Sequence, residues 1–119
     1  MSSYKTLIVW QKAFALAKAT YQLTEQFPKS EIYGLTSQLR RASVSVVSNL
    51  AEGFSRKSPR EHHQFVSIAF GSTSEIETQL LLAKDLEFGR LEEFEKTELL
   101  LEEVRKILNV MLQRLKLKS

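Results

Sequence analysis

The chain has 119 residues, 43% of them hydrophobic, and a formal net charge of +3. This length predicts one domain over residues 1–119, and the absence of cysteine excludes disulfides and thiolate metal sites and favours a reducing cytoplasm. No stretch reaches the roughly 18 apolar residues of a membrane span and the N-terminus lacks the apolar core of a signal peptide, so we expect a soluble, cytoplasmic protein without membrane contact.

The first predicted helix runs from about Thr6 to Gln26 and carries two apolar rows at helical spacing. One row holds Leu7, Trp10, Phe14, Ala17, Tyr21 and Thr24. The row beside it holds Ala13, Leu16, Thr20, Leu23 and Phe27. Pro28 ends the helix, because a proline ring disfavours the α conformation in the residue before it.

The second predicted helix begins within residues 30–35, reaches about Arg56 and carries three rows. The first holds Leu39, Ser43, Val46, Leu50 and Phe54. The second holds Arg40, Val44, Val47 and Ala51, and the third is polar, with Arg41, Ser45, Ser48 and Glu52. A surface helix usually carries a broad charged face. The narrow polar row therefore indicates close neighbours on most sides, including another subunit.

We expect this polar row to form a structural network with the next helix. In this hypothesis Arg41 pairs with Glu52 or with an acid of that helix, because buried charges persist when they are paired and hydrogen-bonded. The candidate acids there are Glu75 and Glu77. The alternative is that Arg41 and its neighbour Arg40 bind a ligand.

The third predicted helix has the clearest start in the chain. Ser58 is the expected N-cap, Pro59 the first helical residue and Glu61 the third. The helical pattern continues to about Phe88, and Gly89 is the expected left-handed cap.

The fourth predicted helix spans about Leu91 to Leu117. Its heptad seam consists of Phe94, Thr97, Leu101, Val104, Leu108, Met111 and Leu115. Short connections make consecutive helices antiparallel neighbours, so the sequence predicts an all-α fold, an up-down-up-down antiparallel four-helix bundle. Leucines at 80–82 and 99–101 widen the apolar surface beyond one seam, which indicates burial between the subunits of a homo-oligomer.

Seven short motifs carry a resemblance to a known family. They are Val9-Trp10-Gln11-Lys12-Ala13, Phe27-Pro28, Tyr33-Gly34-Leu35, Gln38-Leu39-Arg40-Arg41-Ala42, Ser48-Asn49-Leu50-Ala51-Glu52-Gly53, Ile68-Ala69-Phe70-Gly71-Ser72 and Glu75-Ile76-Glu77-Thr78-Gln79-Leu80. Over roughly Leu7 to Leu91 the chain resembles the bacterial four-helix-bundle family of rRNA intervening-sequence proteins. The same superfamily includes the accessory proteins of diversity-generating retroelements.

The resemblance implies a four-helix bundle that assembles into a homo-oligomer, typically a pentamer. It implies no established enzymatic activity, and nucleic-acid association is suspected for the family. We therefore expect a non-enzymatic adaptor whose partner is RNA or DNA, or a protein such as a reverse transcriptase. The alternative is a protein-only scaffold whose charges serve solubility and helix ends.

Charge is distributed unevenly along the chain. Residues 1–60 hold nine Lys and Arg against three Glu, and residues 61–119 hold eight against eleven acidic residues. The bundle topology places the N-terminus, the connection at residues 54–60 and the C-terminus at one end, a plausible phosphate-binding surface. The candidate nucleic-acid-binding residues there are Arg56, Lys57, Arg60, Arg114, Lys116 and Lys118, with Lys5 beside them. The alternative is that these cations only offset helix dipoles.

Residue patterns for metal binding and catalysis are missing from the sequence. The adjacent His62 and His63 point about 100° apart on a helix, and the residues four positions later are not ligand types. The chain has neither a cysteine nucleophile nor a glycine-rich phosphate loop. We therefore expect no enzymatic activity, no cofactor, no metal and no small-molecule substrate.

Overall fold

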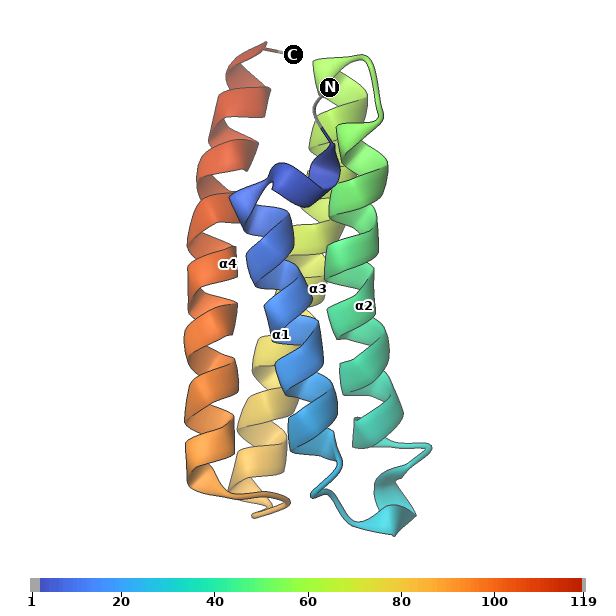
Figure 1. Cartoon of the computed structure of the whole chain (residues 1–119), viewed down its shortest axis with the longest axis vertical. Helices are drawn as coiled ribbons and strands as arrows, with labels where there is room; N and C mark the ends of the chain where they lie inside the picture. Colours follow the sequence, from blue (N-terminus) through green and yellow to red (C-terminus); the bar gives the residue numbers. More distant parts are fainter. Residues whose placement is uncertain (1–2, 119) are drawn as a thin grey trace.

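The computed structural model describes residues 3–118, with side chains for residues 3–116. Four long helices dominate it: α1 (Ile8–Thr24), α2 (Leu35–Phe54), α3 (Pro59–Asp85) and α4 (Leu91–Lys118). The short 3-10 helices η1 (Tyr4–Thr6) and η2 (Lys29–Glu31) precede α1 and α2. The molecule measures 44 × 26 × 24 Å, and successive long helices run in opposite directions along its long axis (Figure 1). The predicted all-α, up-down-up-down four-helix bundle is confirmed.

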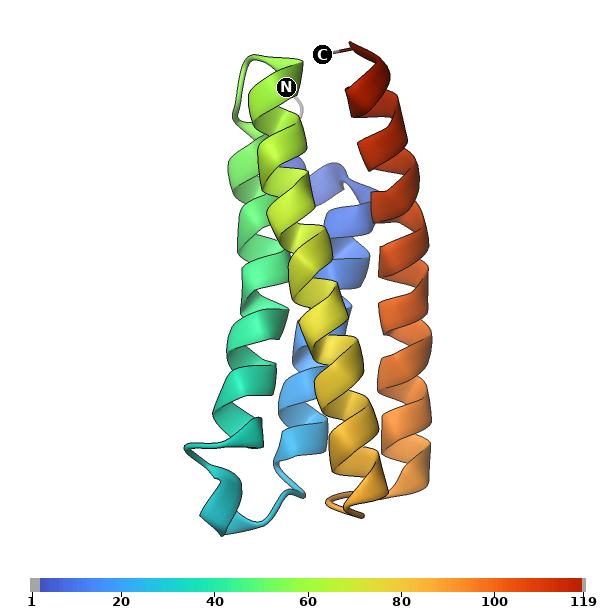
Figure 2. The same cartoon turned by 180° about the vertical axis from the view of Figure 1, so that it is seen from behind.

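The four helices stand at the corners of a square when the bundle is viewed along its axis. α1 and α3 each pack against both α2 and α4, so α1 and α3 occupy opposite corners (Figures 1 and 2). The face between α1 and α2 therefore lies opposite the face between α3 and α4. The most extensive packing is between α2 and α3.

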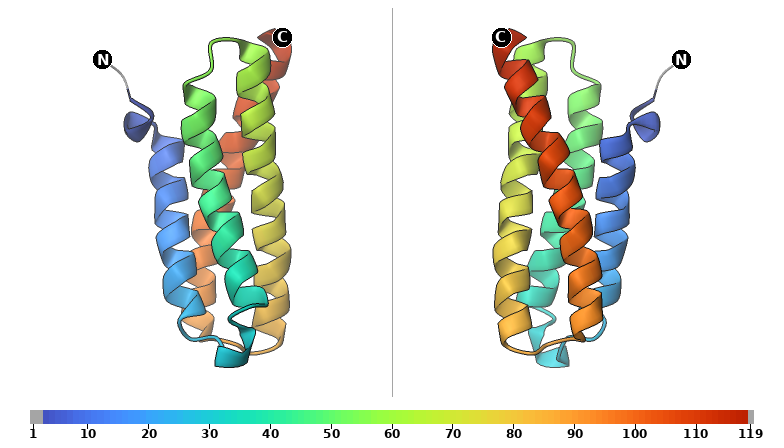
Figure 3. Two further views of the ribbon diagram at one scale, coloured as in Figure 1. Left: turned by 90° about the vertical axis from the view of Figure 1, so that its right-hand side faces the viewer. Right: turned by 90° about the vertical axis from the view of Figure 1, so that its left-hand side faces the viewer.

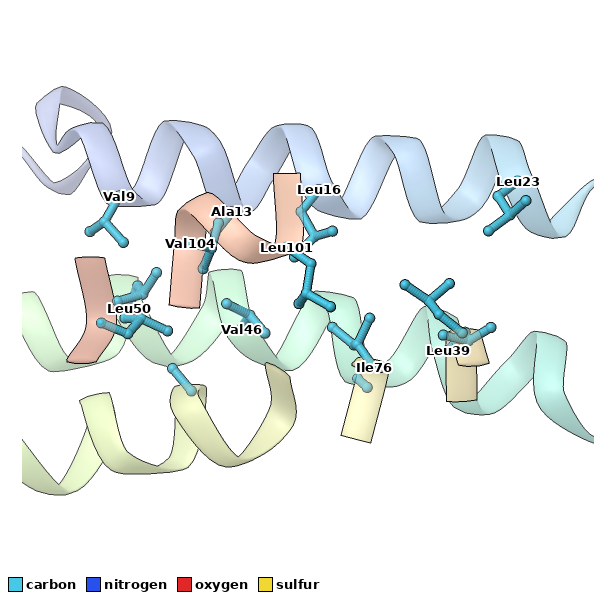
Figure 4. Packing of buried hydrophobic residues seen from close by; sticks show 14 of the residues in the cluster. Val9, Ala13, Leu16, Leu23, Leu39, Val46, Leu50, Ile76, Leu101 and Val104 are labelled. Atoms are coloured by element: carbon cyan, nitrogen blue, oxygen red, sulfur yellow. The ribbon is translucent and has the colours of Figure 1, made fainter. Parts of the chain in front are cut away.

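One row of side chains from each helix fills the core (Figure 4). Its fully buried members include Leu16, Leu23, Leu39, Val46, Ile76, Leu80, Phe94 and Leu108. The heptad seam predicted for α4 is buried except at Met111, which is partly buried. On α1, the core row is the second of the two predicted rows. The first row lies mainly towards the surface, where Phe14 is 46% and Tyr21 43% exposed.

The start of α3 agrees with the prediction, and the other long helices begin and end close to their expected positions. The Ser58 hydroxyl accepts a hydrogen bond from the Glu61 amide at 3.1 Å, and Pro59 occupies the first turn. This local capping satisfies an amide that has no partner inside the helix.

The end of α3 differs from the prediction that Gly89 forms a left-handed cap. The left-handed residue is Glu87, with a φ of 59°, and the Phe88 amide donates to the Ala83 carbonyl at 3.1 Å in a Schellman arrangement. Gly89 instead allows close packing, because a Cβ at this position would lie 3.2 Å from the Leu23 side chain of α1. Gly89 therefore sits in tight surroundings and does not have a left-handed backbone.

The polar row of α2 does not assemble into one network within the chain. Arg41 lies 11 positions from Glu52, which is about 16 Å along a helix, so their expected pairing does not form. Glu52 instead binds Arg56, one turn later, at 2.7 Å. The middle of the row does bond across helices, since the Ser45 and Ser72 hydroxyls lie 2.8 Å apart. The exposed members of the expected network are Arg41, Ser48, Glu52 and Glu75.

Candidate nucleic-acid interface

Three separate segments of the chain lie at the same end of the bundle. They are η1, the connection between α2 and α3, and the C-terminal turns of α4 (Figures 1 and 3). We call this the basic end and define it by its exposed cations Lys5, Arg56, Lys57, Arg60, Arg114 and Lys116. The candidate Lys118 belongs to the last turn of α4, and its side chain lies outside the described residues.

The α2–α3 connection is positioned by a close approach of the two helices. Gly53 is buried, and a Cβ there would lie 2.9 Å from the Phe65 Cβ and 3.2 Å from the His62 ring. The Phe65 ring in turn supports Arg56, whose guanidinium lies 4.6 Å from the ring centre. Burial lowers the pKa of His62 below its usual value, so this side chain is mainly neutral at pH 7 and adds little to the charge of the basic end.

The cations of the α2–α3 connection differ in how they are held. Arg56 binds Glu52 at 2.7 Å in addition to its contact with Phe65. For Lys57 and Arg60, the structure shows no ion pair with any side chain of residues 3–116. These two side chains can therefore meet an external anion without breaking an internal salt bridge.

Acidic residues dominate the opposite end of the bundle. They are Asp85, Glu87, Glu92, Glu93 and Glu95, all near the α3–α4 connection. Arg90 lies among them and approaches Glu92 at 4.0 Å and Glu93 at 3.9 Å. The bundle is thus electrically polar along its long axis.

Between α3 and α4 the structure also contains a partly buried polar cluster around Arg105, which the sequence analysis did not identify. Arg105 of α4 donates hydrogen bonds from Nη1 to the Thr73 and Ser74 hydroxyls of α3, each at 2.9 Å. Its guanidinium lies 4.6 Å from the centre of the Phe70 ring. Because its partners are on another helix more than thirty positions away, no pattern within α4 could have revealed the cluster.

Two negative observations apply to the described part of the chain. Among these residues, no group of three His, Cys, Asp or Glu side chains is placed to hold a metal ion. None of the helices, over the residues described, is both long and apolar enough to cross a membrane. His63 lies 3.4 Å from the Ser67 hydroxyl on its own helix, whereas the His62 ring faces α2, so the two rings do not converge.

Both the sequence and the structure are similar to known proteins. The profile of the family described as 23S rRNA-intervening sequence protein matches residues 5–110. A crystal structure of a Bacteroides thetaiotaomicron protein of unknown function, from the S23 ribosomal protein family, has the same fold. It aligns with a TM-score of 0.79 and 20% identity, over 88% of this chain and 98% of that chain. No curated protein matches the sequence. Since the family profile covers most of its length, the chain belongs to the 23S rRNA-intervening sequence protein family.

Proposed function

We propose that this protein is a non-enzymatic, homo-oligomeric adaptor whose basic end binds nucleic acid or a nucleoprotein. The observation that carries the proposal is the pair of exposed cations Lys57 and Arg60, which lack ion-pair partners among the side chains of residues 3–116. Arg114 and Lys116 lie near the C-terminus of α4, where the helix dipole favours cations. Arg60 lies in the first turn of α3, where the dipole disfavours a cation, so helix-end stabilisation does not explain it.

Exposed apolar side chains support the homo-oligomer. Phe14, Tyr21, Val44, Leu81 and Leu99 are each between 43% and 63% exposed in the single chain. Apolar patches of this kind are unusual on monomers and mark interaction surfaces. A net charge of +3 is modest for one nucleic-acid-binding chain, and several basic ends in one assembly would bind one polyanion with higher avidity.

The expected ligand feature is the phosphate backbone. Lysine and arginine side chains on a helix connection contact phosphates without reading base sequence, and each neutralised phosphate releases counterions. Affinity should therefore depend on salt more strongly than on sequence. The alternative, a protein-only scaffold, predicts no retention of RNA or DNA.

The test compares two variants that carry the same change in net charge at opposite ends of the bundle. Lys57→Glu/Arg60→Glu alters the basic end, and Lys29→Glu/Arg90→Glu alters exposed residues of the other end. Arg56 is left unchanged because it contacts Phe65. Fluorescence anisotropy with single- and double-stranded RNA and DNA, at 50 and 200 mM salt, measures the affinity.

We expect the basic-end variant to lose at least tenfold in affinity and the control to stay close to wild type. The slope of log K against log salt should become shallower by about two, because the variant loses two cations and each phosphate contact contributes about 0.9 to the slope. Equal losses in both variants would show that only net charge matters. If the wild-type protein retains no nucleic acid at 50 mM salt, the nucleic-acid form of the proposal fails, and affinity capture of protein partners becomes the next measurement.

A further inference from the structure

The face between α1 and α2 is an apolar surface with cations around it. Phe14 and Tyr21 of α1 and Val44 of α2 line a shallow groove of about 450 Å³, together with Ala17 and Lys18. These residues come from the apolar row of α1 and the second row of α2 that do not form the centre of the core. The bundle has therefore brought together two apolar rows and left them without a partner.

Cations surround this α1/α2 face. Lys18 is exposed at the groove itself, and Arg40 lies over the Tyr21 ring at 4.8 Å. Arg41 is exposed and precedes Val44 by three positions, so both lie on the outward side of α2. The acid described beside them is Glu25, which Arg40 approaches at 3.4 Å.

The face between α3 and α4 has the complementary character. A groove of about 510 Å³ lies there, with an apolar base that includes Phe70, Leu81 and Leu101. Three carboxylates line it, from Glu77, Glu98 and Glu102, and Glu98 is paired with Lys84 at 3.1 Å. Of its two cations, Arg105 is held by hydroxyls of α3, and Lys106 pairs with Glu102 at 3.3 Å. Glu77 is exposed and has no ion pair with the side chains of residues 3–116.

We propose that the occupant of the α3/α4 groove is the α1/α2 face of a second copy of this chain. The inference rests on the homo-oligomer of the proposed function and specifies its contact. The two surfaces match in kind, since each is apolar at its centre. The α1/α2 face has Lys18 and Arg41 beside it, and the α3/α4 groove offers the carboxylate of Glu77, which has no ion pair with the side chains of residues 3–116. They also lie on opposite sides of the bundle, so every copy presents one of each.

A contact between two different faces is head-to-tail, and repeated from copy to copy it forms a ring where the rotation between neighbours closes and an open filament where it does not. When the ring axis is parallel to the helices, every basic end points in the same direction. The ring then gathers the Lys57 and Arg60 side chains of all copies on one rim. A two-fold contact between identical faces, about an axis perpendicular to the helices, would instead send the basic ends in opposite directions.

The test disables the two faces in separate variants. Phe14→Glu places an anion in the α1/α2 face, and Leu81→Arg places a cation in the α3/α4 groove; both native side chains are about half exposed, at 46% and 58%. Leu82→Arg is the matched control, because Leu82 is 50% exposed and is not part of the groove lining. Light scattering after size exclusion gives the masses, and circular dichroism verifies the fold. Lys18→Glu and Glu77→Lys form a second pair if either first variant fails to fold.

Each face variant alone should be a monomer of 13.7 kDa, because every copy lacks one half of the contact. An equimolar mixture should form a heterodimer of twice that mass, in which the intact α1/α2 face of one variant meets the intact groove of the other. The Leu82→Arg control should keep the wild-type mass. The proposal is overturned if one face variant keeps the wild-type mass or if the mixture stays monomeric. A monomeric wild-type protein would instead refute the homo-oligomer itself.

Discussion

Replacing Gly53 by alanine should destabilise the bundle, and Gly71→Ala is the control that makes the effect measurable. Gly71 is in the interior of α3, Gly53 is the penultimate residue of α2, and neither has a positive φ. Alanine therefore improves helix propensity by up to about 1 kcal/mol at either position. The two sites differ in their surroundings, since Gly53 is buried and a Cβ at Gly71 would meet nothing within 4 Å.

The magnitude at Gly53 follows from the nearest atoms. A new Cβ would lie 2.9 Å from the Cβ of Phe65, whereas carbon atoms in contact are normally about 3.5–4.0 Å apart. The Phe65 Cβ is bonded to the backbone and cannot turn away, so α2 and α3 must move apart. Overpacking of this kind costs about 1–3 kcal/mol. Because any propensity gain at the end of α2 is no larger than the gain at Gly71, Gly53→Ala should be less stable than Gly71→Ala by at least about 1 kcal/mol.

Urea denaturation followed by circular dichroism, at one protein concentration for all samples, measures the difference. Light scattering should accompany it, because dissociation of an oligomer would also change the apparent stability. Equal unfolding midpoints for Gly53→Ala and Gly71→Ala would refute the argument, since the close approach of α2 to α3 would then carry no energetic cost. A Gly53→Ala protein more stable than wild type would refute it equally.

Two further predictions concern titration and backbone conformation. Burial lowers the pKa of His62, so the folded state binds a proton at this ring less readily than the unfolded chain does. Above about pH 6.5 the ring is neutral in both states, and as the pH falls below that value protonation of the unfolded chain lowers the free energy of unfolding. His62→Gln should therefore flatten the fall of the urea midpoint between pH 7 and 5, and an unchanged slope would contradict this cause. Glu87 holds a φ of 59°, a region that costs a non-glycine residue about 1–2 kcal/mol. Glu87→Gly should raise the free energy of unfolding by up to about 1 kcal/mol. A variant that is less stable than wild type in thermal denaturation would show that interactions of the Glu87 side chain outweigh the cost of its left-handed backbone.

The sequence alone determined the helices, their order and the family. Ser58, Pro59 and Glu61 fixed the start of α3, and Pro28 marked the chain reversal after α1, because capping and proline effects act within a single turn. Apolar spacing identified four helices, and short connections made them antiparallel. The seven short motifs indicated a family that the match over residues 5–110 shows independently.

The tertiary structure alone decided which row of each helix faces the core and which polar groups meet. Helical spacing gives two equivalent apolar rows on α1, and only packing against α2 and α4 selects the Leu16 row over the Phe14 row. The same is true of Arg105, whose partners lie on α3, and of Ser45, whose hydroxyl meets that of Ser72 on α3. Periodicity describes one helix at a time, whereas burial and pairing depend on how neighbouring helices are rotated about their axes.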